Sequence, residues 1–179
     1  VGVGQRRRYS DTCQSSSSGG TVLEKPEPFV GLNVYVGREK ALIPHRRRNI
    51  YYSHFAAEPV KIVTVELEPL AVAIDQVRLA VDAEPLTPGT DEDNTRLLDI
   101  AKNVPLKAAG IRTWKAFANA YVCYMVSWKD DEVFIRPSRL DRAGRYEFHR
   151  DFGGYRGPAI PATEIARIII EDYKGRSDG

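Results

Sequence analysis

The sequence has little cysteine and no long apolar run. Only two cysteines occur among its 179 residues, and neither belongs to a CxxC pair or to a Cys/His spacing of the kind that binds zinc. The longest apolar run spans residues 121–126, far short of the about 18 residues that a membrane-spanning helix needs. These absences exclude a zinc-binding cysteine motif and a membrane helix. A chain of this length also buries a sufficient core without disulfides.

The sequence also lacks an excess of charge of either sign, because the formal net charge is only +2. Residues 60–110 are net acidic, whereas the segments before and after them are net basic. Nucleic-acid-binding proteins usually show a clustered basic footprint, so this balance disfavours nucleic acid as the partner without excluding it. With 42% hydrophobic and 28% charged residues, the composition is that of a folded, soluble protein.

The familiar motifs of catalysis and cofactor binding are missing as well. The chain has no P-loop, GxGxxG, HExxH or GxSxG pattern. The glycine-rich run 153–157 lacks the following helix with Lys-Ser/Thr of a phosphate-binding loop, so we interpret it as a plain turn. Asp91, Glu92 and Asp93 lack the Glu at the twelfth position of an EF-hand. We therefore expect no cofactor and no metal.

Cys123 lies within the apolar run, and we expect it to be a buried free thiol. A free thiol without a disulfide framework fits a reducing compartment, so we expect a cytoplasmic protein.

The chain divides into an arm and one domain. Residues 1–28 contain a Ser/Gly run and two prolines, a composition that buries too little apolar area to offset its ordering entropy. We interpret them as a flexible N-terminal arm. Residues 29–179 are predicted to form a single α+β domain.

Hydrophobic periodicity predicts the elements of this domain. Apolar residues at helical spacing, starting with Leu70 after Pro69, indicate a helix that ends at Pro85. A second helix is expected to begin at Thr90 or Asp91 and to bury Leu97, Leu98 and Ala101. The strands are predicted at 29–36, 40–43, 61–67, 121–128 and 132–136, and further helices at 105–121 and 161–173. This order predicts a mixed or antiparallel sheet with hairpins and about four helices packed on it.

The two halves of the chain share an order of short patterns. Each has a strand, a proline, a basic loop, a Tyr-x-x-His step ending at His54 or His149, and a helix that follows a proline. Only the first half has an obvious strand between the histidine and the helix. A duplication and a coincidence both explain the pattern, and we favour coincidence because such short patterns recur by chance.

The acidic segment is the first candidate for function. Between residues 82 and 99, only Arg96 opposes the carboxylates Asp82, Glu84, Asp91, Glu92, Asp93 and Asp99. A loop of this charge inserts readily into a basic active site, where it pairs with Arg and Lys residues meant for phosphate. We take Glu84, Asp91, Glu92, Asp93 and Asp99 as candidate partner-binding residues. A solvated acidic loop is the alternative.

The histidines supply a second candidate. A metal-independent endoribonuclease needs a general base, a general acid and a cation near the transferred phosphate. His54 and His149, with Arg145 and Tyr146, contain those groups. The alternative is that they are ordinary residues of surface loops, because nothing in the sequence brings the two histidines together.

A third interpretation is an RNA-binding module that uses the basic residues 6–8 and 46–48. The aromatic side chains Trp114, Tyr121, Tyr124 and Trp128 are suited to stack on bases. Their apolar surroundings, however, favour a place in the core.

The last third of the chain resembles the immunity proteins of bacterial contact-dependent growth inhibition systems. The similar residues are Val-Cys-Tyr-Met-Val at 122–126, a polar turn, Glu-Val-Phe-Ile-Arg-Pro-Ser at 132–138, and Ile-Pro-Ala-Thr-Glu-Ile-Ala at 160–166. The order of elements is similar over residues 29–174. The resemblance implies an inhibitor without catalysis, which binds one toxin domain delivered by a neighbouring cell, often a nuclease, and blocks its active site. We therefore favour a binding protein over an enzyme.

Overall fold

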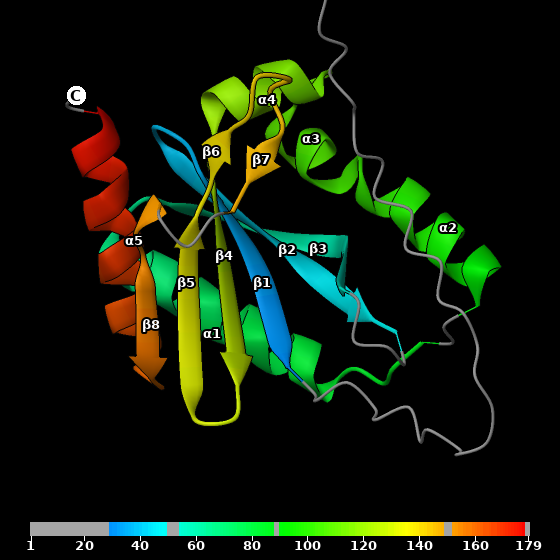
Figure 1. Ribbon diagram of the computed structural model, residues 1–179, viewed down its shortest axis with the longest axis horizontal. Coiled ribbons are helices and arrows are strands. Elements are labelled where there is room, and N and C mark those ends of the chain that lie inside the picture. Colours follow the sequence, from blue (N-terminus) through cyan, green and yellow to red (C-terminus); the bar gives the residue numbers. More distant parts are fainter. Residues whose placement is uncertain (1–28, 50–53, 88–89, 149–151, 178–179) are drawn as a thin grey trace, which may run out of the picture.

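The computed structural model describes residues 29–49, 54–87, 90–148 and 152–177 (Figure 1). The arm predicted at residues 1–28 lies outside the described residues. The strands are β1 (Val30–Val36), β2 (Lys40–Arg48), β3 (His54–Thr64), β4 (Val122–Lys129), β5 (Glu132–Pro137), β6 (Arg139–Leu140), β7 (Tyr146–Glu147) and β8 (Tyr155–Pro158). The helices are α1 (Leu67–Ala83), α2 (Asp91–Ala101), α3 (Val104–Ala109), α4 (Trp114–Ala120) and α5 (Ala162–Ser177).

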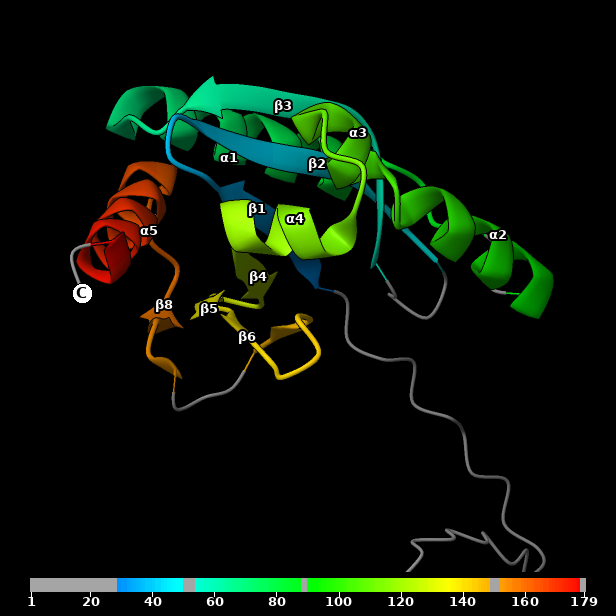
Figure 2. The same cartoon turned by 90° about the horizontal axis from the view of Figure 1, so that it is seen from above.

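Six of the strands form one antiparallel sheet in the order β3-β2-β1-β4-β5-β8. The β6–β7 hairpin is a separate two-stranded sheet. Figure 2 shows the twist of the large sheet, with α1 and α5 on one side of it. The predicted α+β class with an antiparallel sheet and hairpins is thus confirmed.

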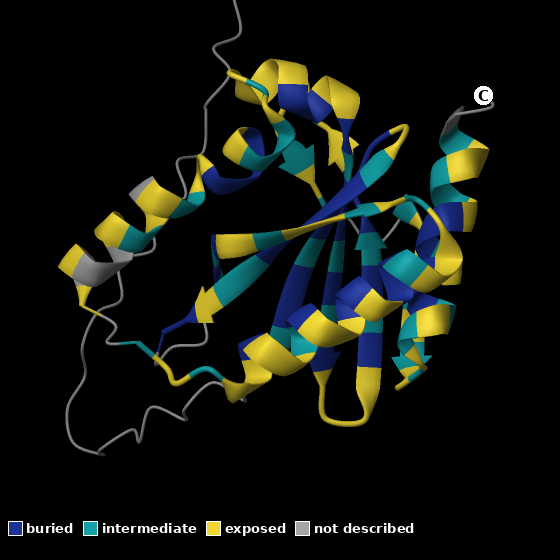
Figure 3. Cartoon of the chain, turned by 180° about the vertical axis from the view of Figure 1, so that it is seen from behind, coloured by how far each residue is buried: buried dark blue, intermediate teal, exposed yellow. Residues whose placement is uncertain are grey.

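The main core lies between this sheet and helices α1 and α5. The strands contribute alternate residues to it, among them Val34, Tyr124, Val126 and Ile135. The helix α1 contributes the face that its periodicity predicts, as the buried stripe in Figure 3 shows. Each large aliphatic side chain buried in this way stabilises the fold by about 1.5–3 kcal/mol.

A smaller core lies on the other face of the sheet, beneath α3 and α4. It contains Tyr35, Leu42, Phe117 and Cys123. Cys123 is a free cysteine and is buried, as predicted. Trp114 differs from the prediction because its side chain is 39% exposed at the start of α4.

The helix predicted at 105–121 is two helices. Gly110 has a φ of +72° and ends α3 in the left-handed conformation that favours glycine. A new helix begins after Thr113, whose hydroxyl accepts a hydrogen bond from the Ala116 amide at 3.3 Å. The glycine stop and the threonine cap therefore divide one apolar pattern into α3 and α4.

Two strands were predicted too short. The basic residues 46–48, expected in a loop, are part of β2, which continues through Pro44 by means of a register shift at Pro44/His45. The partner β3 begins at His54 and ends at Thr64, before Leu67, which is 44% exposed at the start of α1.

The glycine-rich run 153–157, predicted as a plain turn, contributes most of β8 instead. As a result, the strands of the large sheet and the helix that follows them have the order β-β-β-α in both halves. These are β1-β2-β3-α1 and, apart from the inserted β6–β7 hairpin, β4-β5-β8-α5. The halves meet at the antiparallel β1–β4 pair in the middle of the sheet, and α1 packs against α5. This common order favours a repeat over the coincidence that the sequence suggested.

Candidate partner-binding surface

Residues 91–101 of the acidic segment form the helix α2, which packs against β3 and α3. Figure 1 shows α2 projecting from the side of the molecule opposite α5. The prediction that α2 buries Leu98 is wrong, because this side chain is 58% exposed, while Leu97 and Ala101 are half-buried. The helix presents one face to the body, and its described residues Glu92, Leu98 and Ile100 are exposed to a partner.

Three of the predicted binding residues, Asp91, Glu92 and Asp93, occupy the first turn of α2. Carboxylates are stable there because the helix dipole and the free backbone N–H groups favour negative charge. Glu92 is exposed, and Asp99 lies two turns further along. The side chains of residues 91, 93 and 99 lie outside the described part of the structure. The backbone places all four acidic positions on one projecting helix.

Glu84, the remaining predicted residue, follows the end of α1 and interacts within the fold. Its Oε2 forms a short contact with His45 Nε2, and its Oε1 lies 3.5 Å from Arg47 Nε. Arg48 pairs in turn with Asp82, whose backbone carbonyl accepts a 2.9 Å hydrogen bond from Arg48 Nη2. The charge of Glu84 is therefore partly neutralised before any partner arrives.

An open cleft of about 370 Å³ lies between α2, α3 and β3. Phe55, Leu97, Ile100 and Val104 supply its apolar lining, and Arg47 and Lys107 contribute cationic side chains. Ile100 is 51% exposed beside the exposed Leu98. The acidic helix thus combines a charged first turn with apolar side chains further along, which is the composition of many protein interfaces.

His54, from the candidate nuclease set, has a structural partner. Its Nε2 accepts a hydrogen bond from the Gly31 amide at 3.1 Å, and its ring lies 4.5 Å from that of Phe29. The Gly31 amide is available because β1 pairs with β2 at Tyr35 and Val36, whereas the two strands diverge toward the Gly31 end of β1. A general base would have to give up this bond.

The other described members of the candidate nuclease set, Arg145 and Tyr146, belong to the β6–β7 hairpin. Tyr146 donates a 2.8 Å hydrogen bond to the Tyr121 carbonyl, and burial raises the pKa of its hydroxyl. Arg145 pairs with Asp141 at 2.8 Å, and hydrogen bonding from the Arg145 amide lowers the pKa of the Asp141 carboxyl. His149 lies outside the described residues. Among the described residues, no group of acidic, histidine and cysteine side chains has the arrangement of a metal site.

The basic residues 46–48 differ in their surroundings. Arg46 lies near Tyr35 and Cys123, donates a 2.7 Å hydrogen bond to the His54 carbonyl, and has its pKa lowered by burial. Burial also raises the pKa values of Tyr35 and Cys123. This run is not the solvated basic loop that the RNA-binding interpretation needs.

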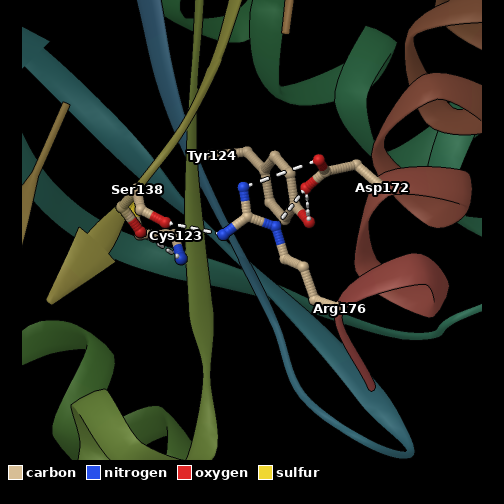
Figure 4. Close-up of polar contacts among 5 residues, drawn as sticks. All are labelled: Cys123, Tyr124, Ser138, Asp172 and Arg176. Atoms are coloured by element: carbon tan, nitrogen blue, oxygen red, sulfur yellow. Dashed lines mark hydrogen bonds and ion pairs between the residues drawn. The ribbon is translucent and has the colours of Figure 1, made fainter. Parts of the chain in front are cut away.

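A polar network that the sequence did not reveal ties α5 to the sheet (Figure 4). Asp172 accepts hydrogen bonds from the Tyr124 hydroxyl at 2.8 Å and from Arg176 Nε at 2.6 Å. Arg176 also donates to the Ser138 carbonyl at 3.0 Å, and Ser138 Oγ accepts from the Cys123 amide at 3.0 Å. Only the spacing of Asp172 and Arg176, four residues apart on a helix, signals part of this network in the sequence.

The sequence matches no protein-family model and no curated protein. The fold, by contrast, is similar to solved structures. A protein of unknown function from Neisseria meningitidis superposes with a TM-score of 0.61 at 12% identity, covering 80% of this chain and 92% of that one. A chain of the CdiA-CT/CdiI toxin and immunity complex from Yersinia pseudotuberculosis gives 0.58 at 11% identity, with 80% and 95% covered. At such identities the likeness is one of fold. In the described part of the chain, no helix is long and apolar enough to cross a membrane.

Proposed function

We propose that this protein is a cytoplasmic immunity protein of a contact-dependent growth inhibition system, which binds a toxin domain and blocks its active site. The observation that carries the proposal is the projecting acidic helix α2 beside a cleft with apolar side chains in its lining. The fold supports it, because a similar fold occurs in a chain of a toxin and immunity complex. The protein would act by binding alone.

The acidic first turn of α2 would supply recognition. A nuclease toxin presents Arg and Lys side chains that hold phosphate, and Asp91, Glu92 and Asp93 would pair with them in place of the substrate. Such charges accelerate association by long-range attraction, an effect that salt weakens. The carboxylates would thus determine which toxin is bound and how fast.

The apolar part of the surface would hold the complex together. Leu98 and Ile100 are exposed on α2, and Phe55 lies in the adjoining cleft. A stable interface buries about 1,600 Å² in total, and a few well-packed side chains near its centre carry most of the binding energy. We expect loss of Leu98 or Ile100 to speed dissociation, and loss of the carboxylates mainly to slow association.

Charge reversal on α2 tests the proposal. The triple variant Asp91→Lys, Glu92→Lys, Asp93→Lys should abolish protection of cells that express the toxin domain encoded beside this protein. A matched control reverses two carboxylates on exposed positions elsewhere, Asp75→Lys on α1 and Glu171→Lys on α5, and should still protect. Full protection by the triple variant would contradict the role of α2.

A further inference from the structure

One part of the sheet surface is covered by none of the described helices. Side chains at alternate positions of β1, β4 and β5 point to α1 and α5, so the residues between them face the opposite side. There α3 and α4 cover one end, over Tyr35 and Cys123. Figure 1 shows the other end of β4 and β5 without a helix in front of it. The half-buried side chains of Met125, Ser127, Phe134 and Arg136 belong to this face.

Two arginines converge on one aromatic ring in this region. The guanidinium carbons of Arg136 and Arg156 lie 5.6 and 5.1 Å from the centroid of the Phe134 ring. The strand register explains the arrangement, because Phe134 is paired with Arg156 across β5 and β8, and Arg136 is two residues further along β5. Stacking of this kind holds each guanidinium plane in place and leaves its N–H groups for an acceptor.

A recess of about 460 Å³ adjoins these arginines, lined by Phe134, Arg136, Gly154, Tyr155 and Arg156. Gly154 shapes it, since this residue has a φ of +106° and a Cβ there would stand 2.1 Å from the Ile135 carbonyl oxygen. The chain therefore passes closer to β5 than any side chain would permit. We call this recess the Phe134 cleft.

The charges of the Phe134 cleft favour an anionic ligand. None of the described residues that line it is acidic. In the part of the chain that the structure describes, Arg156 pairs with the acidic Glu132 at 3.7 Å, and the side chain of Arg156 is 65% exposed. An exposed pair at that distance contributes little, so both guanidiniums retain donors for a carboxylate or a phosphate.

The surroundings of the Phe134 ring favour a carboxylate ligand over the phosphates of a nucleic acid. Single-stranded nucleic acid binds to open sheets by stacking its bases on exposed aromatic faces, but Arg136 and Arg156 already lie over Phe134. Tyr155 donates its hydroxyl to the Pro158 carbonyl and packs against the main core. Carboxylate side chains need no stacking surface and pair with arginine through two parallel hydrogen bonds.

We propose that the Phe134 cleft binds an acidic segment of a protein, with Arg136 and Arg156 each pairing with an Asp or Glu side chain. This second docking surface has the opposite charge to α2 and is built from other elements. It therefore stands independently of the toxin-binding role proposed for α2.

The probe is a fluorescein-labelled eight-residue peptide in which Glu alternates with Ser, compared with the same peptide carrying Gln. Fluorescence anisotropy should show binding of the Glu peptide and at least tenfold weaker binding of the Gln peptide. Backbone amide NMR signals of Phe134, Arg136 and Arg156 should move on titration. Weak affinity is expected, because the short peptide orders on binding.

The double variant Arg136→Gln, Arg156→Gln should reduce the affinity at least tenfold. Arg78→Gln is the matched control, since Arg78 also stacks on an aromatic ring, that of Trp128 at 5.0 Å, but belongs to α1. If the double variant fails to fold by circular dichroism, Arg156→Gln alone replaces it, with a loss of at least threefold. Equal binding of the Glu and Gln peptides, or no binding of either, would overturn the proposal. So would tighter binding of an eight-nucleotide oligouridylate to the same residues.

Discussion

The network around Asp172 provides a sharp test of how α5 is held. In Tyr124→Phe the ring remains and only the hydroxyl is removed, so no cavity complicates the result. Tyr124 is 1% exposed, and its hydroxyl donates to the Asp172 carboxylate at 2.8 Å. Hydrogen bonds to charged groups contribute about 1.5–3 kcal/mol. We expect Tyr124→Phe to lower the free energy of unfolding by about 2 kcal/mol.

Urea unfolding followed by circular dichroism at neutral pH measures this loss. A loss of this size should lower Tm by about 4–8 °C for a domain of this length. Tyr155→Phe is the control, because the Tyr155 hydroxyl donates to an exposed backbone carbonyl at 3.1 Å and water replaces that bond at a cost of about 0.5 kcal/mol or less. Asp172→Ala should lower the free energy of unfolding more than Tyr124→Phe does, because it leaves the buried Tyr124 hydroxyl without its acceptor. A Tyr124→Phe variant as stable as Tyr155→Phe would refute the stabilising role of the Tyr124–Asp172 hydrogen bond.

Three further predictions concern other parts of the fold. Burial raises the pKa of the Cys123 thiol, so alkylation followed by peptide mass spectrometry should leave Cys123 unmodified in the native protein and modify it in urea. Hydrogen bonds from the Arg145 amide and side chain lower the pKa of Asp141. The stability that Asp141 gives the β6–β7 hairpin is therefore present above the ordinary carboxyl pKa of about 3.9 and lost as pH falls through the lowered folded value. A carboxyl NMR titration should show that Arg145→Ala raises the Asp141 pKa. Gly154→Ala should cost about 3 kcal/mol in urea unfolding, because the Cβ would clash with the Ile135 carbonyl, whereas Gly153→Ala, with nothing within 4 Å of its Cβ, should cost about 1–2 kcal/mol for its positive φ alone.

The elements that the sequence predicted well are those with a strong local signal. Residues such as Leu70, Ile74 and Val77 recur at helical spacing and are all buried in α1. The apolar run 121–126 that became β4 was similarly distinct, because it is continuous and a polar turn follows it at residues 130–131. In α1 the periodicity reports directly which face meets the core, and in β4 the continuous run reports that both faces are buried.

The strand β8 shows where local signals fail. Its sequence contains glycine and proline, which have low strand propensity, yet it pairs with β5 over four residues. The conformation of Gly154 and the exposed edge of β5 decide the outcome, and neither is visible in a window of residues. Recognition of β8 would have completed the second half and revealed its β-β-β-α order.

The sequence predicted where the acidic surface lies in the chain, but not which residues contact it in the fold. Carboxylates at a helix start are a local signal, and Asp91 to Asp93 do form the first turn of α2. The contact of Glu84 with His45 joins residues 39 positions apart, and the bond from Gly31 to His54 joins residues 23 positions apart. Such pairs depend on how β2 and β3 curve away from β1, which only the folded chain defines.

The most direct measurement is a calorimetric titration of this protein with the toxin domain encoded beside it, paired with an assay of toxin activity. We predict one-to-one binding with nanomolar Kd, loss of toxin activity at equivalence, and an association rate that falls as salt increases. Absence of binding, or a complex in which the toxin remains fully active, would contradict the immunity function.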